Sequence, residues 1–236
     1  MKYIVILIAA MAVLTVSCGR KKSEANSEEP ALAQALADSA AMMAGVSGDT
    51  TAVATNDTTA TVAPKPVEEP VFEMVTTYGT MRIKLFKDTP RHRDNFVKLV
   101  GEGFYDGLLF HRVIDGFMIQ GGDPLTRDEA NKSRFGTGDV GYTIPAEFVP
   151  EHKHVKGALA AARMGDAANP YKESSGCQFY IVQDDQGCRH LDGEYTVYGQ
   201  VISGLDVIDK IAAARTDWYD CPERPVRILS VKPVNE

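Results

Sequence analysis

The stretch FHRVIDGFMIQGGD, residues 110–123, decides both the fold and the site that this chain is expected to form. Its two short apolar runs flank Asp115-Gly116, a dipeptide that strongly favours the tight turn of a β-hairpin. The same runs carry Arg112 and Gln120, although a charge buried without a partner costs several kcal/mol. The strand pairing therefore has to give both polar side chains a role.

Two registers are open for this hairpin. A two-residue turn places Arg112 and Gln120 on opposite faces, and leaves one of them without an obvious role. A three-residue loop that includes Phe117 pairs Ile114 with Met118. That register sets Arg112 directly across from Gln120 on one face, with Cβ atoms about 5 Å apart. We favour the second register, because Gln120 can then hold the guanidinium while the loop presents Phe117 at the rim of an apolar patch.

Short strands dominate the chain after Val71. The segment 71–86 alternates in polarity and breaks at Tyr78-Gly79, which predicts a hairpin. One helix is expected to begin at Thr89-Pro90 and to stop at Gly101, and a second to run over residues 205–214. Further strands are expected near residues 110–114, 118–120, 158–162, 178–182, 196–201 and 226–234. This pattern predicts a mainly β domain, a closed or sandwiched antiparallel sheet with a helix over each open end.

The first 70 residues do not share this pattern. Residues 1–17 carry an apolar core, YIVILIAAMAVLTV, that is short for a membrane span and typical of a signal peptide. The core runs into Ser17-Cys18-Gly19, which resembles a bacterial lipoprotein signal with Cys18 as the lipidated residue. An uncleaved anchor or an ordinary secretory signal is the alternative. Residues 18–70 are rich in Ala, Thr, Ser and Pro, which predicts a disordered tether before a domain at 71–236.

Charge content narrows the possible partners, and cysteine content limits the possible disulfides. The net charge of −7 argues against nucleic acid as a partner. An exported protein can form disulfides, so the three cysteines beyond Cys18 leave at least one thiol free. The sequence does not determine whether any of them pair: Cys177, Cys188 and Cys221.

Histidines give no clear metal signal. His152-Lys153-His154 has metal-like spacing, but no carboxylate or cysteine pattern accompanies it, so no metal site is expected. His111 is expected to be a structural side chain on the strand face opposite Arg112. No cofactor motif is present in the sequence.

The hairpin stretch resembles the signature of the cyclophilin family of peptidyl-prolyl cis–trans isomerases. The likeness continues, in family order, through TPRHRDNFVKLV (89–100), GALAAAR (157–163), SSGCQFYIV (174–182) and LDGEYTVYGQVISGLDVIDKI (191–211). It covers essentially all of residues 71–236. The resemblance implies a closed eight-stranded antiparallel β-barrel capped by two α-helices, and a monomer is expected.

The implied reaction is rotation about an X–Pro bond, which faces a barrier of about 18–20 kcal/mol because amide resonance is lost in the twisted state. No bond is made or broken, so the reaction needs no nucleophile, metal or cofactor. A fixed donor near the prolyl nitrogen and a pocket for the proline ring would bind the twisted state best. By resemblance, Arg112 is that donor, and Gln120 orients it and the substrate backbone.

The resemblance also assigns the substrate-binding residues. The proline pocket is expected to be formed by Phe117, Met118, Tyr180 and Leu191, with Tyr195 as one wall. The adjoining groove for the peptide backbone is expected to be lined by Ala162, Arg163 and Gln178.

Three positions depart from the family pattern. Many members have tryptophan where this chain has His190, histidine where it has Tyr195, and phenylalanine where it has Tyr180. The first change should weaken the binding of cyclosporin-type inhibitors, and the second alters one wall of the proline pocket. Segments 124–141 and 164–174 are longer than the common form, so a different groove specificity is expected.

The leading hypothesis is an exported, lipid-anchored prolyl isomerase that assists the folding of envelope proteins. Gly19 after the cysteine favours the outer membrane, facing the periplasm, by resemblance to known sorting signals. Its partners would be proline-containing polypeptides and, through the lipid, the membrane. The alternative is a non-catalytic module that binds proline segments or acts as a chaperone, an option that His190 and Tyr195 keep open. A third hypothesis is an envelope scaffold that binds no soluble peptide.

Overall fold

The computed structural model of the chain describes residues 68–234. The predicted signal peptide, Cys18 and nearly all of the tether lie outside the described residues, so those predictions stay untested by the fold. Within residues 68–234, no helix has the length and apolar character needed to span a bilayer.

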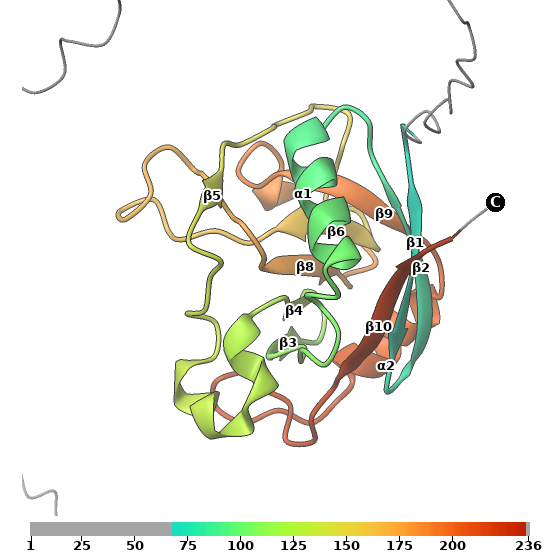
Figure 1. The fold of residues 1–236 in the computed structure, drawn as a ribbon, viewed down its shortest axis with the longest axis vertical. Coiled ribbons are helices and arrows are strands. Elements are labelled where there is room, and N and C mark those ends of the chain that lie inside the picture. The colour runs from blue at the N-terminus through green and yellow to red at the C-terminus, as the bar shows by residue number, and fades with distance from the viewer. Residues whose placement is uncertain (1–67, 235–236) are drawn as a thin grey trace, which may run out of the picture. The chain divides into compact units, whose positions relative to one another are not determined.

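The described chain is built on one eight-stranded antiparallel sheet with two α-helices (Figure 1). Its strands follow the order β10-β1-β2-β9-β6-β8-β4-β3, and β5 and β7 form a separate two-stranded ribbon. The elements in chain order are β1 (Val71–Thr76), β2 (Gly79–Leu85), α1 (Pro90–Gly101), β3 (Arg112–Ile114), β4 (Met118–Gly121), η1 (Pro124–Arg127), η2 (Glu129–Arg134), β5 (Thr143–Ile144), β6 (Ala158–Ala161), β7 (Ser174–Ser175), β8 (Phe179–Val182), η3 (Arg189–Leu191), β9 (Val197–Ser203), α2 (Leu205–Ala212) and β10 (Ile228–Pro233). All the predicted strands and both helices are present, whereas the 3-10 helices and the ribbon were not predicted.

The mainly β fold is confirmed, but the predicted closure of the barrel is wrong. The edge strands β3 and β10 form no ladder with each other in the described chain, so the sheet is curled and open. The two edges are joined before β3 by an isolated bridge between Leu109 and Arg227 and by the Phe110 N–H, which donates to Val226 O at 2.9 Å. Beyond that point a loop takes over, because the Val113 N–H donates to the carbonyl of Asp220, which lies outside any strand.

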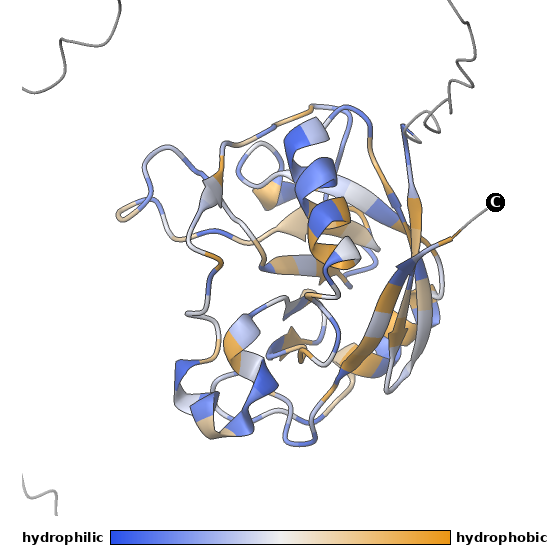
Figure 2. Ribbon diagram, viewed as in Figure 1, coloured by the Kyte–Doolittle hydropathy of each residue, from blue (hydrophilic) through white to orange (hydrophobic). Residues whose placement is uncertain are grey.

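The main core lies between one face of the sheet and the two helices. Alternation along β2 buries Met81, Ile83 and Leu85 completely, as the sequence pattern predicts. Helix α1 lies against β9 and β10, and α2 lies against β2, β3 and β4. Figure 2 shows hydrophobic segments along the strands and mostly polar ones over the 3-10 helical region.

A second apolar cluster covers the opposite face of the central strands. Met118, Ala160, Tyr180 and Val182 belong to it, whereas their immediate neighbours in sequence, such as Ile181, point into the main core. Strands β6 and β8 are therefore buried on both faces. This second face carries the candidate site.

Local sequence signals place the start of α1 and the buried faces of both helices. Pro90 is the first residue of α1, which suits a residue without an N–H, although Thr89 makes no side-chain cap. On the buried face of α1 lie Phe96 and Leu99, and on that of α2 lie Ile208 and Ile211. Leu205, the first residue of α2, is 40% exposed.

Gly122 fixes how β4 leaves the sheet, and its substitution tests the local packing. Its φ is +89°, and a Cβ there would lie 2.3 Å from the carbonyl oxygen of Cys177. Gly107 has a similar φ of +84° with nothing within 4 Å of a Cβ. We expect Gly107→Ala to cost about 1–2 kcal/mol of unfolding free energy through its dihedral alone. Gly122→Ala should cost at least about 2 kcal/mol more, because the backbone itself must shift.

Urea denaturation of the two variants and the wild type measures this difference. Equal losses in both variants would show that the contact with Cys177 adds nothing to the dihedral cost.

Candidate active site

The hairpin adopts the favoured register. Arg112 pairs with Gln120 and Ile114 with Met118 across β3 and β4. Phe117 lies in the loop, where its N–H donates to Ile114 O at 3.1 Å. Because paired residues project to the same face of a sheet, Arg112 and Gln120 share one face, as predicted.

The tip of the hairpin is held by the segment that follows β8. The carbonyl of Phe117 accepts from the N–H groups of Gln183 at 2.8 Å and Asp184 at 3.2 Å. The Gly116 N–H donates to Oε1 of Gln183 at 2.8 Å, and Nε2 of Gln183 donates to Asp209 of α2 at 2.9 Å. Phe117 is thus fixed at the rim through its backbone, which leaves its ring available to a ligand.

A small pocket of about 120 Å³ lies on this face, and nine of the ten predicted site residues line it. They are Arg112, Phe117, Met118, Gln120, Ala162, Arg163, Tyr180, Leu191 and Tyr195. The buried side chains of Met118 and Tyr180 form its apolar base, and the Tyr195 ring meets Tyr180 edge-on with centroids 5.9 Å apart. The pocket therefore combines two arginines and an amide with an apolar base and apolar side chains at its rim.

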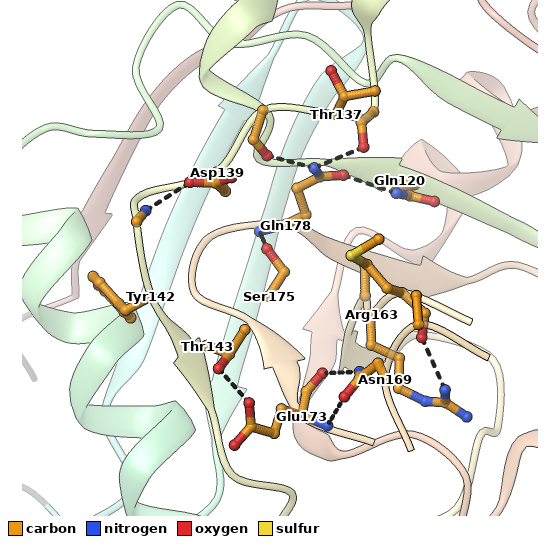
Figure 3. A pocket seen from close by; sticks show the side chains of 16 residues that line it. Gln120, Thr137, Asp139, Tyr142, Thr143, Arg163, Asn169, Glu173, Ser175 and Gln178 are labelled. Carbon is orange, nitrogen blue, oxygen red and sulfur yellow. Dashed lines mark hydrogen bonds between the residues drawn. The ribbon is translucent and has the colours of Figure 1, made fainter. Parts of the chain in front are cut away.

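A larger cavity of about 780 Å³ adjoins this pocket and holds the tenth predicted residue, Gln178 (Figure 3). The two cavities share Gln120, Ala162 and Arg163 in their linings. Its far side is built by segments 136–143 and 164–175, which overlap the two segments expected to be longer than usual. Together the two cavities offer a groove in which an extended peptide could lie with one residue in the small pocket.

Two glutamines connect the cavities. Nε2 of Gln178 donates to the carbonyls of Gly136 at 3.1 Å and Gly138 at 2.7 Å, and its Oε1 accepts from Nε2 of Gln120 at 3.1 Å (Figure 3). Both amide orientations follow from these bonds, since the backbone carbonyls only accept. The expected hydrogen bond from Gln120 to Arg112 is not among the contacts of the described residues. Gln120 is instead oriented by Gln178.

The guanidinium of Arg112 contacts a different side chain from the one predicted. Its Nε lies 3.6 Å from Oδ2 of Asp220, and both side chains are close to half exposed. Asp220 has a φ of +60°, an uncommon conformation for a residue other than glycine, while its carbonyl accepts from the β3 edge. Sequence reasoning missed Asp220, because it lies in a loop about a hundred residues away with no motif around it.

Arg163 braces one wall of the pocket. Its side chain is 4% exposed, and its guanidinium lies over the Tyr195 ring at 4.4 Å. It donates to the carbonyls of Glu194 at 2.9 Å and Met164 at 3.0 Å, and to Asp166 at 2.6 Å. The buried guanidinium is therefore largely occupied by the protein itself, so we assign Arg163 to the support of Tyr195.

Comparison with known proteins gives the site its context. The family model described as "Cyclophilin type peptidyl-prolyl cis-trans isomerase/CLD" matches residues 71–233. The chain belongs to the cyclophilin family. This family is an enzyme class, the peptidyl-prolyl cis–trans isomerases, and the described part of the chain is a prolyl isomerase domain.

Individual relatives agree with this assignment. The chain is 36% identical over 166 residues to peptidyl-prolyl cis-trans isomerase-like 2 of Rhizopus delemar, covering 67% of this chain and 28% of that protein. It is 41% identical over 140 residues to a peptidyl-prolyl cis-trans isomerase of Helicobacter pylori, covering 58% and 76%. The chain thus spans little more than a quarter of the first relative and about three quarters of the second.

A solved cyclophilin of Cryptosporidium parvum has a similar structure. It superposes with a TM-score of 0.62 at 27% identity, over 71% of this chain and 99% of that one. The same protein in the presence of the dipeptide Ala-Pro gives a TM-score of 0.61, at 27% identity over 70% and 99%.

The departures from the cyclophilin pattern have clear places in the structure. His190 stacks on Phe117 at the rim, with ring centroids 6.2 Å apart.

Cys177, Cys188 and Cys221 are all buried free thiols. Burial raises the pKa of the Cys177 thiol to about 11, so it stays protonated at neutral pH. Within residues 68–234, no group of three His, Cys, Asp or Glu side chains is placed to hold a metal ion.

His111 immediately precedes β3 and is 4% exposed, as suits a structural side chain. Its placement on the strand face opposite Arg112 stays a prediction. Neither of its ring nitrogens has a hydrogen-bond partner in the described structure. Burial lowers the pKa of His111 to about 4, with Asp123 opposing that effect. The imidazole is therefore neutral in the folded protein at pH 5–7.

This depressed pKa predicts acid destabilisation of the fold. Between pH 6.5 and about 4 the unfolded chain binds a proton that folded His111 does not, so stability falls as the pH falls. The full shift corresponds to about 3 kcal/mol. We expect the wild type to lose roughly 2 kcal/mol more than His111→Leu between pH 7.5 and pH 4.5, as measured by urea denaturation. Parallel losses in both proteins would rule His111 out as the cause.

Proposed function

We propose that this chain is an exported, lipid-anchored prolyl isomerase that accelerates X–Pro rotation in folding envelope proteins. The observation that carries the proposal is the shared face of Arg112 and Gln120 at a small pocket with an apolar base. A proline ring is apolar and compact, so it suits a base formed by Met118 and Tyr180 with the Phe117 ring at the rim.

The mechanism follows from what the twisted amide needs. When resonance is lost, the prolyl nitrogen becomes pyramidal and regains a lone pair that can accept a hydrogen bond. Arg112 would donate to that nitrogen, while the amide of Gln120, fixed by Gln178, would hold the neighbouring peptide carbonyl or N–H. Interactions made only in the twisted state lower the barrier, and each 1.36 kcal/mol gained there gives a tenfold faster rotation.

A second function is supported by the neighbour of Arg112. A carboxylate 3.6 Å from Nε competes with a substrate for the guanidinium. If Asp220 kept the guanidinium away from the prolyl nitrogen, the groove would still bind proline peptides without catalysing rotation. The chain would then be a proline-peptide-binding or chaperone module.

Substitution of Arg112 separates these two functions. Arg112→Ala in the full chain should lower the kcat/KM for an Ala-Ala-Pro-Phe peptide about 100- to 1000-fold, the usual range for loss of a transition-state donor. The dissociation constant of the peptide should change less than about threefold. Exchange NMR on the peptide measures both quantities without an auxiliary protease.

Arg82→Ala is the matched control, because Arg82 lies on β2 with its side chain 53% exposed. It should leave both quantities unchanged. Wild-type rotation no faster than that of Arg112→Ala, with peptide still bound, would identify a binding module instead of an isomerase.

Export and lipidation rest on the sequence of residues 1–19, which has a short apolar core followed by Ser17-Cys18-Gly19. A lipid on Cys18 would place the isomerase at a membrane surface. The segment between Cys18 and Val71 is long enough to let the domain reach chains that emerge nearby. Proline-containing envelope proteins would be its substrates.

Cys18→Ser tests the anchor. In bacterial cells fed a labelled fatty acid, the wild type should carry the label and fractionate with membranes. Cys18→Ser should lose both properties, whereas Cys221→Ser, which changes a buried thiol, should retain them. Label on the Cys18→Ser protein, or an unlabelled wild type, would contradict the proposal.

A further inference from the structure

His154 lies directly behind the proline pocket without lining it. Its side chain is completely buried. Its Nε2 lies 2.9 Å from the hydroxyl of Tyr180, and its Nδ1 lies 2.9 Å from Oδ1 of Asp192. The sequence motif His152-Lys153-His154 therefore has a role unrelated to metal binding for its last residue.

The chemistry of the partners fixes the proton positions. An ionised carboxylate only accepts, so Nδ1–H of His154 donates to Asp192. Nε2 then carries a lone pair and accepts from the Tyr180 hydroxyl. Burial lowers the pKa of His154, with Asp192 opposing that effect, and burial also raises the pKa of Tyr180. The net direction of both pKa shifts favours the neutral imidazole and the protonated phenol that these two hydrogen bonds require.

The backbone of His154 holds the loop over the pocket. Its N–H donates to Oδ1 of Asp192 at 3.0 Å, and its carbonyl accepts from the Cys188 N–H at 2.7 Å. These two anchors flank η3, which carries Leu191 of the pocket wall and His190 of the rim. One residue thus contacts the base of the pocket and the two residues that flank η3.

We infer that His154 is a positioning residue for prolyl-peptide binding. Its neutral imidazole fixes the Tyr180 ring beneath the proline and, through Asp192, the loop that carries Leu191. The inference rests on the proposed function of the pocket, but it concerns how tightly the pocket binds. It also explains why Tyr180 suits this chain in place of phenylalanine, which would leave Nε2 buried without a partner.

Protonation of His154 should disturb this arrangement. A cationic imidazole would donate from Nε2, and the Tyr180 hydroxyl hydrogen would then have to turn toward apolar neighbours. The titratable and charged groups that face His154 are Asp192, Lys153, His190 and Tyr180. Of these, only Asp192 favours the cation. Peptide binding should therefore weaken as the pH falls.

A double-mutant cycle on the full chain tests the inference. The variants are His154→Leu, Tyr180→Phe and the double variant, and the probe is the Ala-Ala-Pro-Phe peptide. At pH 7.5 His154→Leu should raise the dissociation constant about tenfold, because the hydroxyl of Tyr180 loses its acceptor. It should change kcat less than threefold. The double variant should recover to within about threefold of the wild type, since neither of those two polar groups remains unpaired.

The pH profile gives an independent readout. The wild-type dissociation constant should rise at least threefold between pH 7.5 and pH 5, and that of the double variant should stay constant. His152→Leu is the matched control. His152 lies two residues before His154, stacks on Phe86, and its Nε2 makes no hydrogen bond in the described structure. It should retain the wild-type affinity and pH profile.

The inference is overturned if His154→Leu binds within twofold of the wild type, or if its effect and that of Tyr180→Phe are additive. Should His154→Leu fail to fold, the wild-type and Tyr180→Phe pH profiles decide: identical profiles overturn the inference, and a flatter one for Tyr180→Phe supports it. Because affinity is measured apart from rotation, a wild type that binds without catalysis would refute the isomerase proposal and leave this test intact.

Discussion

The register of the β3–β4 hairpin is the constraint on which the rest of the structure depends. Side chains alternate across a strand, so a slip of one residue would exchange the two faces of β4. Ile119 would then leave the main core, and Gln120 would enter it. Since β4 pairs with β8, and β8 with β6, the same slip would disturb the apolar clusters on both sides of the central strands. Core packing therefore fixes the position of Arg112 more firmly than any contact of the arginine itself.

The polar groups of the site are held by a different means, through loops that return to the sheet. Gln178 is oriented by the carbonyls of Gly136 and Gly138, and Gln120 is oriented by Gln178. The amide of Gln178 is thus set by two backbone carbonyls, and it sets the amide of Gln120 in turn. Such preorganisation matters for a reaction whose barrier comes from lost resonance. Donors that reorient during the twist would spend reorganisation energy, which reduces the net stabilisation of the twisted state.

Local patterns predicted what local physics controls. Alternation identified the buried face of β2, a proline identified the start of α1, and the pairing of two polar side chains identified the hairpin register. The open sheet edge, the Asp220 carboxylate and the His154 hydrogen bonds were not predictable in this way. Each joins segments that lie 26 to 118 residues apart, measured from Tyr180 to His154 and from Leu109 to Arg227. A loop carboxylate with no motif around it gives no signal until the fold brings it to the arginine.

The two buried histidines near the site show how position in the fold, and not residue type, determines what acid does to this protein. Burial lowers the pKa of both His111 and His154. His111 has no hydrogen-bond partner in the described structure, and Asp123 offsets only part of the effect of burial, so its protonation acts on the fold as a whole. His154 has Asp192 on one nitrogen and Tyr180 on the other, so a proton there exchanges one hydrogen-bond direction for another and acts on the pocket. The groups that line the small pocket are two arginines, two phenols, an amide and apolar side chains, residue types that do not ordinarily change charge between pH 5 and 8. A site of this kind suits a reaction that moves no proton, and any pH dependence of binding must reach it from the residues behind.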